Sequence, residues 1–163
     1  MNDKESKGIV LVVDDSADAL GIINELLVKD GYTVSIAMDG VQALAIAGRL
    51  TPDIVLMDAI MPNMNGFEAC TALKNSSALC DVPVIFMTGL SESEDVIRGL
   101  EAGGVDYINK PIKLDELLAR VKVHLNNSRK TRSARVALDE VGQSALACDI
   151  NGRIVWSTDY ARA

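Results

Sequence analysis

The sequence is poor in the residues that build disulfide frameworks and zinc sites. Its 163 residues include three cysteines, with no C-x-x-C pair, and a single histidine. A disulfide framework needs paired cysteines, and a structural zinc site needs clustered cysteine or histidine ligands, so the composition argues against both. We therefore expect Cys70, Cys80 and Cys148 to serve as small apolar residues.

Long hydrophobic runs are also missing. The apolar runs are short enough for strands, and the first residues, MNDKESK, are polar and charged. A transmembrane helix takes about 20 apolar residues, and a secretory signal has an apolar core. The pattern predicts neither, so we expect a cytoplasmic protein that does not contact the membrane.

Positive charge is scarce. Lysine and arginine number 16 against 23 aspartates and glutamates, which gives a net charge of -7. This balance disfavours nucleic-acid binding by the chain as a whole and suits divalent cations. The exception is RKTRSAR at residues 129–135, which we interpret as a solvated helix end or a linker. A nucleic-acid contact there is the alternative, but no aromatic residues interleave the basic ones.

The apolar residues, 48% of the chain, follow an alternating pattern. Five short β-rich runs alternate with amphipathic helical stretches, which predicts an α/β fold with a doubly wound five-stranded parallel sheet. Ser91 and Glu94 form a capping box at the start of the fourth predicted helix. The runs are 9–13, 33–37, 54–57, 84–87 and 107–109, and the last helix carries an apolar face of Leu114, Leu117, Leu118, Val121 and Leu125.

Polar residues follow four of these runs: Asp14 and Asp15, Asp58, Thr88, and Lys110. The carboxyl ends of parallel strands gather at one edge of a sheet, so these side chains can converge. Three carboxylates repel one another unless a cation neutralises them, and all-oxygen ligands favour Mg²⁺. A carboxylate can also attack phosphorus, and a lysine and a hydroxyl group can stabilise the charge that develops.

The motifs around these residues resemble the receiver domain of two-component response regulators. They are the DD after the first run, VLMDAIMPNMNG around Asp58, MTG at Thr88 and YINKP at Lys110. The resemblance implies a flavodoxin-like (βα)5 receiver domain over residues 8–128. It also implies that Asp58 accepts a phosphoryl group from a partner histidine kinase or phosphotransfer protein. Asp14 or Asp15, Asp58 and the Ile60 carbonyl would hold Mg²⁺, and Lys110 would pair with the phosphate.

The same resemblance implies a switch. Thr88 would move to hydrogen-bond the phosphate, Tyr107 would turn inward, and the face formed by residues 91–125 would change its partner preference. We expect a phosphorylation-dependent homodimer and a downstream output, such as transcription. The Lys110–Pro111 bond is a candidate cis peptide that would aim the lysine, although Pro111 would otherwise simply order the loop.

Two other functions would use some of the same residues. A Mg²⁺-dependent phosphohydrolase with an aspartate nucleophile needs a second carboxylate two residues later, where this chain has Ile60. A scaffold that is never phosphorylated would have lost a site residue, and none is lost. We therefore expect no enzymatic activity beyond the gain and loss of the phosphoryl group. The apolar residues Ile60 and Leu90 beside the site predict that this loss is slow.

Two features lie outside the predicted site. His124 has no ligand partner at helical spacing, so we expect a structural or exposed role. After the basic linker at 129–136, residues 137–163 contain Asn151-Gly152 between two apolar runs, which predicts a hairpin. This segment resembles the start of a PAS-type sensory module, and a disordered tail is the alternative. Any contact with DNA would come from a region absent from this chain.

Overall fold

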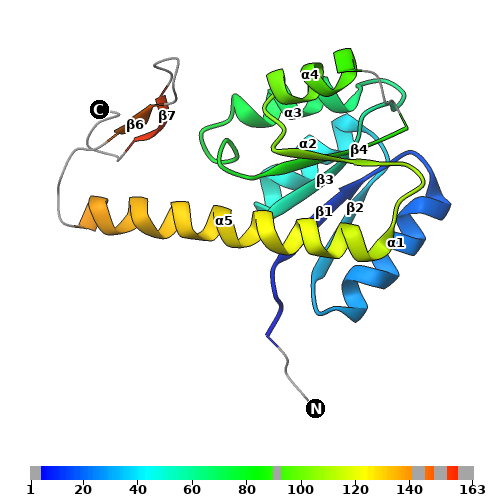
Figure 1. The fold of residues 1–163 in the computed structure, drawn as a ribbon, viewed down its shortest axis with the longest axis horizontal. Coiled ribbons are helices and arrows are strands. Elements are labelled where there is room, and N and C mark those ends of the chain that lie inside the picture. Colours follow the sequence, from blue (N-terminus) through cyan, green and yellow to red (C-terminus); the bar gives the residue numbers. More distant parts are fainter. Residues whose placement is uncertain (1–4, 90–92, 141–145, 149–153, 158–163) are drawn as a thin grey trace. The chain divides into compact units, whose positions relative to one another are not determined.

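A five-stranded parallel sheet lies at the centre of the protein, with strands in the order β2-β1-β3-β4-β5 (Figure 1). Its neighbouring strands pair in parallel throughout. The predicted doubly wound, flavodoxin-like fold is confirmed. The strands are β1 (Ile9–Val13), β2 (Thr33–Ala37), β3 (Ile54–Asp58), β4 (Val84–Thr88) and β5 (Asp106–Asn109), and the helices that alternate with them are α1 (Ala17–Lys29), α2 (Gly40–Leu50), α3 (Gly66–Lys74), α4 (Ser93–Glu101) and α5 (Leu114–Glu140).

These features come from a computed structural model that describes residues 5–89, 93–140, 146–148 and 154–157. The chain forms two compact units, Met1–Leu125 and Asn126–Ala163. The first unit contains the whole parallel sheet. Within the described residues, no helix combines the length and the apolar character needed to cross a bilayer.

Helices cover both faces of the sheet, which explains why the central strands are apolar at consecutive positions. One face packs against α1 and α5, and the other against α2 and α3 (Figure 1). On the face covered by α1 and α5, the buried helical residues include Leu20, Ile23, Leu27, Leu117, Val121 and Leu125. On the face covered by α2 and α3, they include Ala43, Ala47, Phe67, Cys70 and Leu73.

Short polar side chains start three of the helices. Ser16 accepts a hydrogen bond from the backbone N–H of Ala19 at 3.3 Å. Asp39 and Asn65 cap α2 and α3 in the same way, at 2.8 and 2.9 Å. Each cap satisfies a backbone donor that has no partner within its helix. Asn65 therefore starts the helix that follows the loop after Asp58.

The last helix differs from its predicted form. It extends to Glu140, so the basic residues 129–135 lie inside α5 and any linker there is helical. Leu114, predicted on the apolar face, is 39% exposed because it is the first residue of the helix. Leu117, Val121 and Leu125 are buried as predicted. In the fourth helix, Ser91 of the predicted capping box lies outside the described residues.

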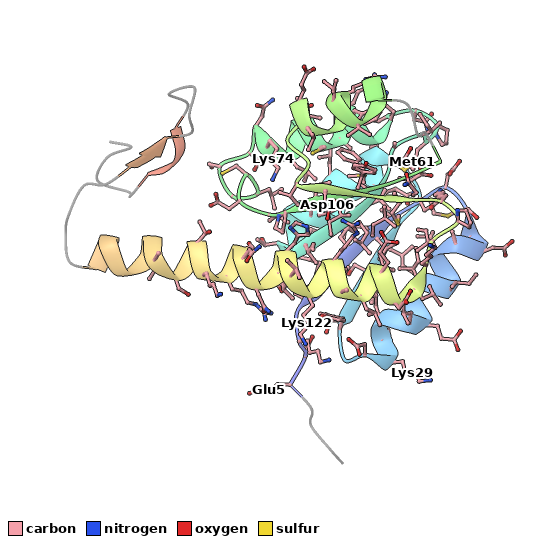
Figure 2. All side chains as sticks on the ribbon, viewed as in Figure 1. Glu5, Lys29, Met61, Lys74, Asp106 and Lys122 are labelled. Atoms are coloured by element: carbon pink, nitrogen blue, oxygen red, sulfur yellow. The ribbon has the colours of Figure 1, made fainter. Side chains whose placement is uncertain are left out.

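A lysine fastens the loop between α3 and β4. The Lys74 Nζ atom donates to the carbonyl oxygens of Cys80 and Val82, at 3.2 and 2.6 Å (Figure 2). Burial lowers the pKa of this lysine. Cys70, on the preceding turn of α3, is fully buried and donates to the Ala102 carbonyl at 3.4 Å, and Cys80 is half-buried. These two thiols thus have the packing role expected from the sequence.

The second unit contains two short strands, β6 (Leu146–Cys148) and β7 (Ile154–Ser157). They pair antiparallel, with an irregularity between Ala147 and Cys148. Antiparallel pairing of neighbouring strands is what the predicted hairpin requires. The predicted turn at Asn151-Gly152 lies outside the described residues.

Candidate functional site

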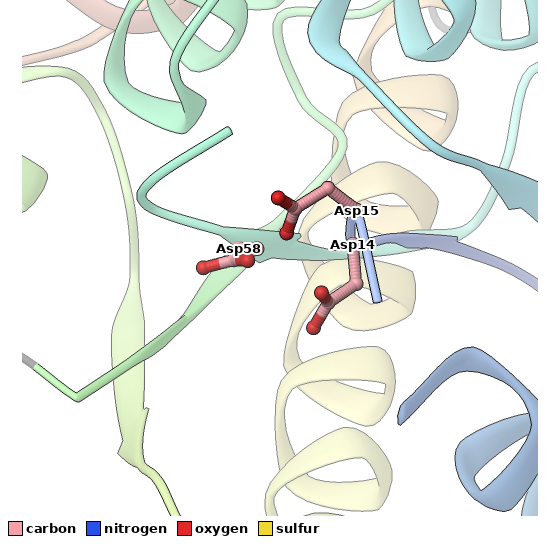
Figure 3. Close-up of side chains that lie close together, drawn as sticks. All are labelled: Asp14, Asp15 and Asp58. Carbon is pink, nitrogen blue, oxygen red and sulfur yellow. The ribbon is translucent and has the colours of Figure 1, made fainter. Parts of the chain in front are cut away.

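Three carboxylates meet at the carboxyl edge of the sheet (Figure 3). Val13 of β1 and Met57 of β3 are register partners, so the residues that follow them lie side by side. Asp14, Asp15 and Asp58 each place a carboxylate oxygen within 4.8 Å of the other two. Asp14 is fully buried and Asp58 is 5% exposed, whereas Asp15 faces solvent. The topology thus brings together the three carboxylates that the sequence pattern predicts at this edge.

Lys110 bridges two of these carboxylates. Its Nζ atom lies 3.1 Å from Asp14 Oδ2 and 3.3 Å from Asp58 Oδ2. The peptide bond from Lys110 to Pro111 is cis. The backbone N–H of Lys110 also donates to the Thr88 carbonyl at 2.9 Å, which ties the end of β5 to the end of β4. The lysine therefore reaches the acidic cluster from the far edge of the sheet.

The environment of Asp58 works against its negative charge. Burial, together with the neighbouring charge of Asp14, raises the pKa of Asp58 from 3.8 to about 6. Attraction to Lys110 and a hydrogen bond from the backbone N–H of Ile60, at 3.3 Å, lower it in part. Burial and a neighbouring carboxylate both disfavour the charged form of a carboxyl group, so the raised pKa marks Asp58 as a candidate functional residue.

The donor set of the cluster fits a hard divalent cation. All three side chains offer oxygen atoms, the ligands that Mg²⁺ prefers, and they lie close enough to share one ion. Asp14 Oδ1 also accepts the backbone N–H of Ser16 at 2.9 Å, which fixes that carboxylate in place. Asp14, Asp15 and Asp58 are therefore the residues that could hold a metal.

A glycine shapes the loop after the acidic strand. A Cβ atom on Gly66 would lie 2.1 Å from the Asp58 carbonyl oxygen, closer than any side chain allows. The backbone N–H of Gly66 donates to the Ala59 carbonyl at 2.9 Å, which closes the loop. The start of α3 can approach Asp58 this closely only because residue 66 has no side chain. The NG dipeptide in VLMDAIMPNMNG was the available sequence signal for this approach.

The two predicted switch residues lie on neighbouring strands. Thr88 ends β4 and is 7% exposed, and it is the register partner of Asn109 in β5. Tyr107, two residues earlier in β5, is 36% exposed. Both residues line a cavity of about 10 Å³ together with Val96 of α4. A cavity of this size accommodates about one water molecule and is too small for a tyrosine ring.

One group of polar residues was not foreseen. Asp106 of β5 lies 2.9 Å from the Nε2 atom of His124, for which helical spacing predicts no ligand partner. Arg120 contacts the same carboxylate. Helical spacing could relate Arg120 to His124, but it could not reveal a partner that comes from a strand.

Comparisons with known proteins agree with this geometry. Residues 10–122 match the response regulator receiver domain. The DNA-binding response regulator MtrA of Mycobacterium tuberculosis is 36% identical over 132 residues, which cover 81% of this chain and 57% of MtrA. The response regulator PleD of Caulobacter vibrioides is 36% identical over 160 residues, covering 94% of this chain and 35% of PleD. The chain thus spans only about a third to a half of these relatives.

Solved structures give the same result. The chemotaxis response regulator CheY4 of Vibrio cholerae superposes with a TM-score of 0.68 and 31% identity, over 71% of this chain and 97% of CheY4. The receiver domain of the Francisella response regulator 1452 gives a TM-score of 0.70 and 30% identity, over 75% and 99% of the two chains. None of these similarities supports a PAS-type module in residues 137–163, which stays a prediction. By its sequence, its fold and the residues gathered at its sheet edge, the chain belongs to the response regulator receiver family.

Proposed function

We propose that this protein is a phosphorylation-controlled switch in which Asp58 accepts a phosphoryl group from a partner histidine kinase or phosphotransfer protein. The observation that carries the proposal is the convergence of Asp14, Asp15 and Asp58 within 4.8 Å, with Lys110 between two of them. These residues lie at the carboxyl edge of the sheet, where doubly wound folds place their ligands. The site thus combines a cluster of carboxylates with the Lys110 ammonium group, which lies beside Asp58, the proposed nucleophile.

The chemistry follows from these groups. A carboxylate oxygen of Asp58 attacks phosphorus, the P–N bond of the phosphohistidine breaks, and its electron pair stays on the imidazole nitrogen. With a pKa of about 6, Asp58 is largely ionised at neutral pH and can act as the nucleophile. Lys110 Nζ, 3.3 Å from Asp58, then lies where it can pair with the phosphoryl oxygens. When bound by Asp14, Asp15, Asp58 and the Ile60 carbonyl, Mg²⁺ would neutralise charge on those oxygens.

Mass spectrometry after treatment with a small-molecule phosphodonor and Mg²⁺ tests this proposal. The wild type should gain one phosphoryl group, and Asp58→Asn should gain none. Asp18→Asn removes an exposed carboxyl from α1 and is the matched control, which should behave as wild type. Absence of an adduct on the wild type would contradict the proposal and favour an unphosphorylated scaffold. Turnover of a phosphate ester would instead favour the phosphohydrolase.

The switch would act through the face formed by α4, β5 and α5. Ile97 and Leu100 of α4 are 53% and 54% exposed, and Val105 and Tyr107 beside them in sequence are 44% and 36% exposed. Apolar side chains clustered at a surface favour association. We infer that movement of Thr88 and Tyr107 after phosphorylation rearranges this face and promotes a homodimer.

Light scattering with and without the phosphodonor measures the dimer. Phosphorylation should raise the mass of the wild type, and Ile97→Asp should abolish the increase because it places a charge in the interface. Ile22→Asp changes a residue of equal size and 56% exposure on α1, so it should still dimerise. A phosphorylated wild type that stays monomeric, or an Ile97→Asp variant that dimerises normally, would contradict this interface.

The output is proposed from the relatives. MtrA is named a DNA-binding response regulator, and RpaA of Synechocystis, 31% identical over 137 residues, a DNA-binding transcriptional regulator. We infer a cytoplasmic role in transcription, with DNA bound by a region that these 163 residues do not include. Chromatin immunoprecipitation of the full-length regulator, with and without Asp58→Asn, tests this inference, because enrichment of DNA sites should depend on Asp58.

A further inference from the structure

A carboxylate on β5 holds two consecutive turns of α5. Asp106, which is labelled in Figure 2, accepts hydrogen bonds through Oδ2 from Arg120 Nη1 at 2.6 Å and from His124 Nε2 at 2.9 Å. Arg120 and His124 are four residues apart, which is about one turn of the helix. Two contacts one turn apart fix both the rotation of α5 and its position along its axis relative to β5.

The contacts are partly shielded from water. The side chains of Asp106 and His124 are 21% and 20% exposed, and that of Arg120 is 38% exposed. Burial alone would raise the pKa of Asp106, but the hydrogen bonds from His124 and Arg120 outweigh burial and lower it. Arg120 is itself held by Glu116, with Nε and Nη2 each 3.0 Å from Oε1. A charge-assisted pair in this setting is stronger than an ion pair in full solvent.

The same carboxylate is joined to the switch tyrosine. Asp106 Oδ1 accepts the backbone N–H of Tyr107 at 2.8 Å. Asp106, Tyr107 and Thr88 also line the same small cavity. A rearrangement that moves the backbone of β5 at Tyr107 would therefore act on the segment that also holds α5. The helix continues from Leu114 to Glu140 and so contributes residues to both compact units.

We propose that Asp106 is a clamp that couples the Tyr107 segment to α5, and that phosphorylation of Asp58 loosens it. In the unphosphorylated protein, the clamp holds α5 in one rotation and one axial position relative to β5. When Tyr107 moves, the Asp106 carboxylate turns away from Arg120 and His124. The α5 helix can then adopt a second position relative to β5. The loosening step rests on the proposed phosphorylation of Asp58, whereas the clamp itself does not. A two-state element of this kind is what carries a local charge change to a distant segment.

Hydrogen exchange of the full chain, followed by mass spectrometry of peptides from α5, tests the clamp. Beryllium fluoride with Mg²⁺ serves as the probe for the phosphorylated state. In the wild type, residues 114–125 should exchange about fivefold faster once the probe is bound, the factor expected for about one lost hydrogen bond. Asp106→Asn should exchange about fivefold faster already without the probe, and binding should change it little. Lys122→Gln changes an exposed residue of the same helix and leaves Asp106, Arg120 and His124 in place, so this control should behave as wild type.

The result that overturns the proposal is an Asp106→Asn variant whose α5 exchange equals wild type without the probe. Unchanged exchange of wild-type α5 on binding would likewise overturn the loosening step. Exchange in α2, on the other face of the sheet, reports any general unfolding of the variant. His124→Leu, which removes only one donor, should give an intermediate rate if the clamp is intact. If fluorine NMR shows no probe bound to wild type, the function proposed for Asp58 fails, while the comparison without the probe still tests the clamp.

Discussion

Replacing Asp58 with asparagine should stabilise the protein at neutral pH. The folded state holds this carboxylate beside Asp14 in a site that is 5% exposed, so ionisation of Asp58 costs more in the folded than in the unfolded chain. Asparagine has nearly the same shape but carries no charge. Its side-chain oxygen can also keep the hydrogen bond from the Ile60 N–H. The variant therefore removes a destabilising charge with little change in packing.

The size of the effect follows from the pKa. A rise from 3.8 to about 6 corresponds to about 3 kcal/mol of unfolding free energy. The attraction of Lys110 is already contained in that pKa, and local relaxation reduces the cost, so we expect a gain of about 1–3 kcal/mol. Because the folded state binds the proton more tightly, the stabilising contribution of protonated Asp58 is present below pH 3.8. It is lost as the pH rises through about 6.

Urea unfolding followed by circular dichroism, in the absence of divalent cations, measures this difference. Asp58→Asn should exceed wild type in unfolding free energy at about pH 7.5, and the two should nearly coincide at about pH 4, where Asp58 is protonated in the folded state. Mg²⁺ should raise the stability of wild type at the higher pH, since a ligand that binds only the folded state stabilises it. The asparagine variant should lose that response.

Asp15→Asn is the matched control, because Asp15 belongs to the same carboxylate cluster but is exposed. Without Mg²⁺ its stability should stay within about 0.5 kcal/mol of wild type, as for most surface substitutions. Its response to Mg²⁺ should nevertheless fall, because a ligand is lost. If Asp58→Asn proves less stable than wild type at about pH 7.5, the account of Asp58 as a buried, repelled charge is refuted.

Three further predictions concern the surroundings of Asp58. Gly66→Ala should destabilise the fold by about 2–3 kcal/mol, because its Cβ would overlap the Asp58 carbonyl. Gly48→Ala in α2, with open space around it, should stabilise by about 0.5–1 kcal/mol, and equal effects in thermal unfolding would contradict the close approach. Lys110→Met should raise the pKa of Asp58 above about 6 in an NMR titration, since it removes an attraction, and a lower value would count against that pairing. Phosphorylated wild type should keep its label longer than minutes in Mg²⁺, and Ile60→Asn should shorten that time by orienting water; loss of wild-type label within seconds would rule this out.

Much of the fold followed from local pattern. The first two strands have the predicted bounds, and the third and fourth each extend only one residue farther, to Asp58 and Thr88. Each buried strand needs a short apolar run, and each helix needs an apolar stripe. Both patterns involve residues close together in the sequence, so the sequence alone predicts these elements. The carboxyl ends of parallel strands lie at one edge of the sheet. This rule predicts that Asp14, Asp58 and Lys110 lie close together, without any knowledge of tertiary contacts.

The end of α5 shows what local pattern leaves open. Residues 129–135 lack an apolar stripe, which predicts either a solvated helix end or a linker, and in the structure the helix continues through them to Glu140. Lysine and arginine have good helix propensity, and an exposed helix needs no apolar face once its preceding turns are formed. Hydrophobic periodicity therefore underestimates the length of a helix whose last turns are polar.

The sequence by itself determined the order of elements, the edge at which the acidic residues and Lys110 meet, and the family to which the chain belongs. Tertiary structure alone decided that Gly66 approaches the Asp58 carbonyl, that Asp58 is buried enough to raise its pKa, and that Asp106 holds Arg120 and His124. The physical reason is the sequence separation of the interacting residues. Secondary structure reflects neighbours along the chain, whereas burial and ion pairs depend on distances between elements that only the packed fold sets.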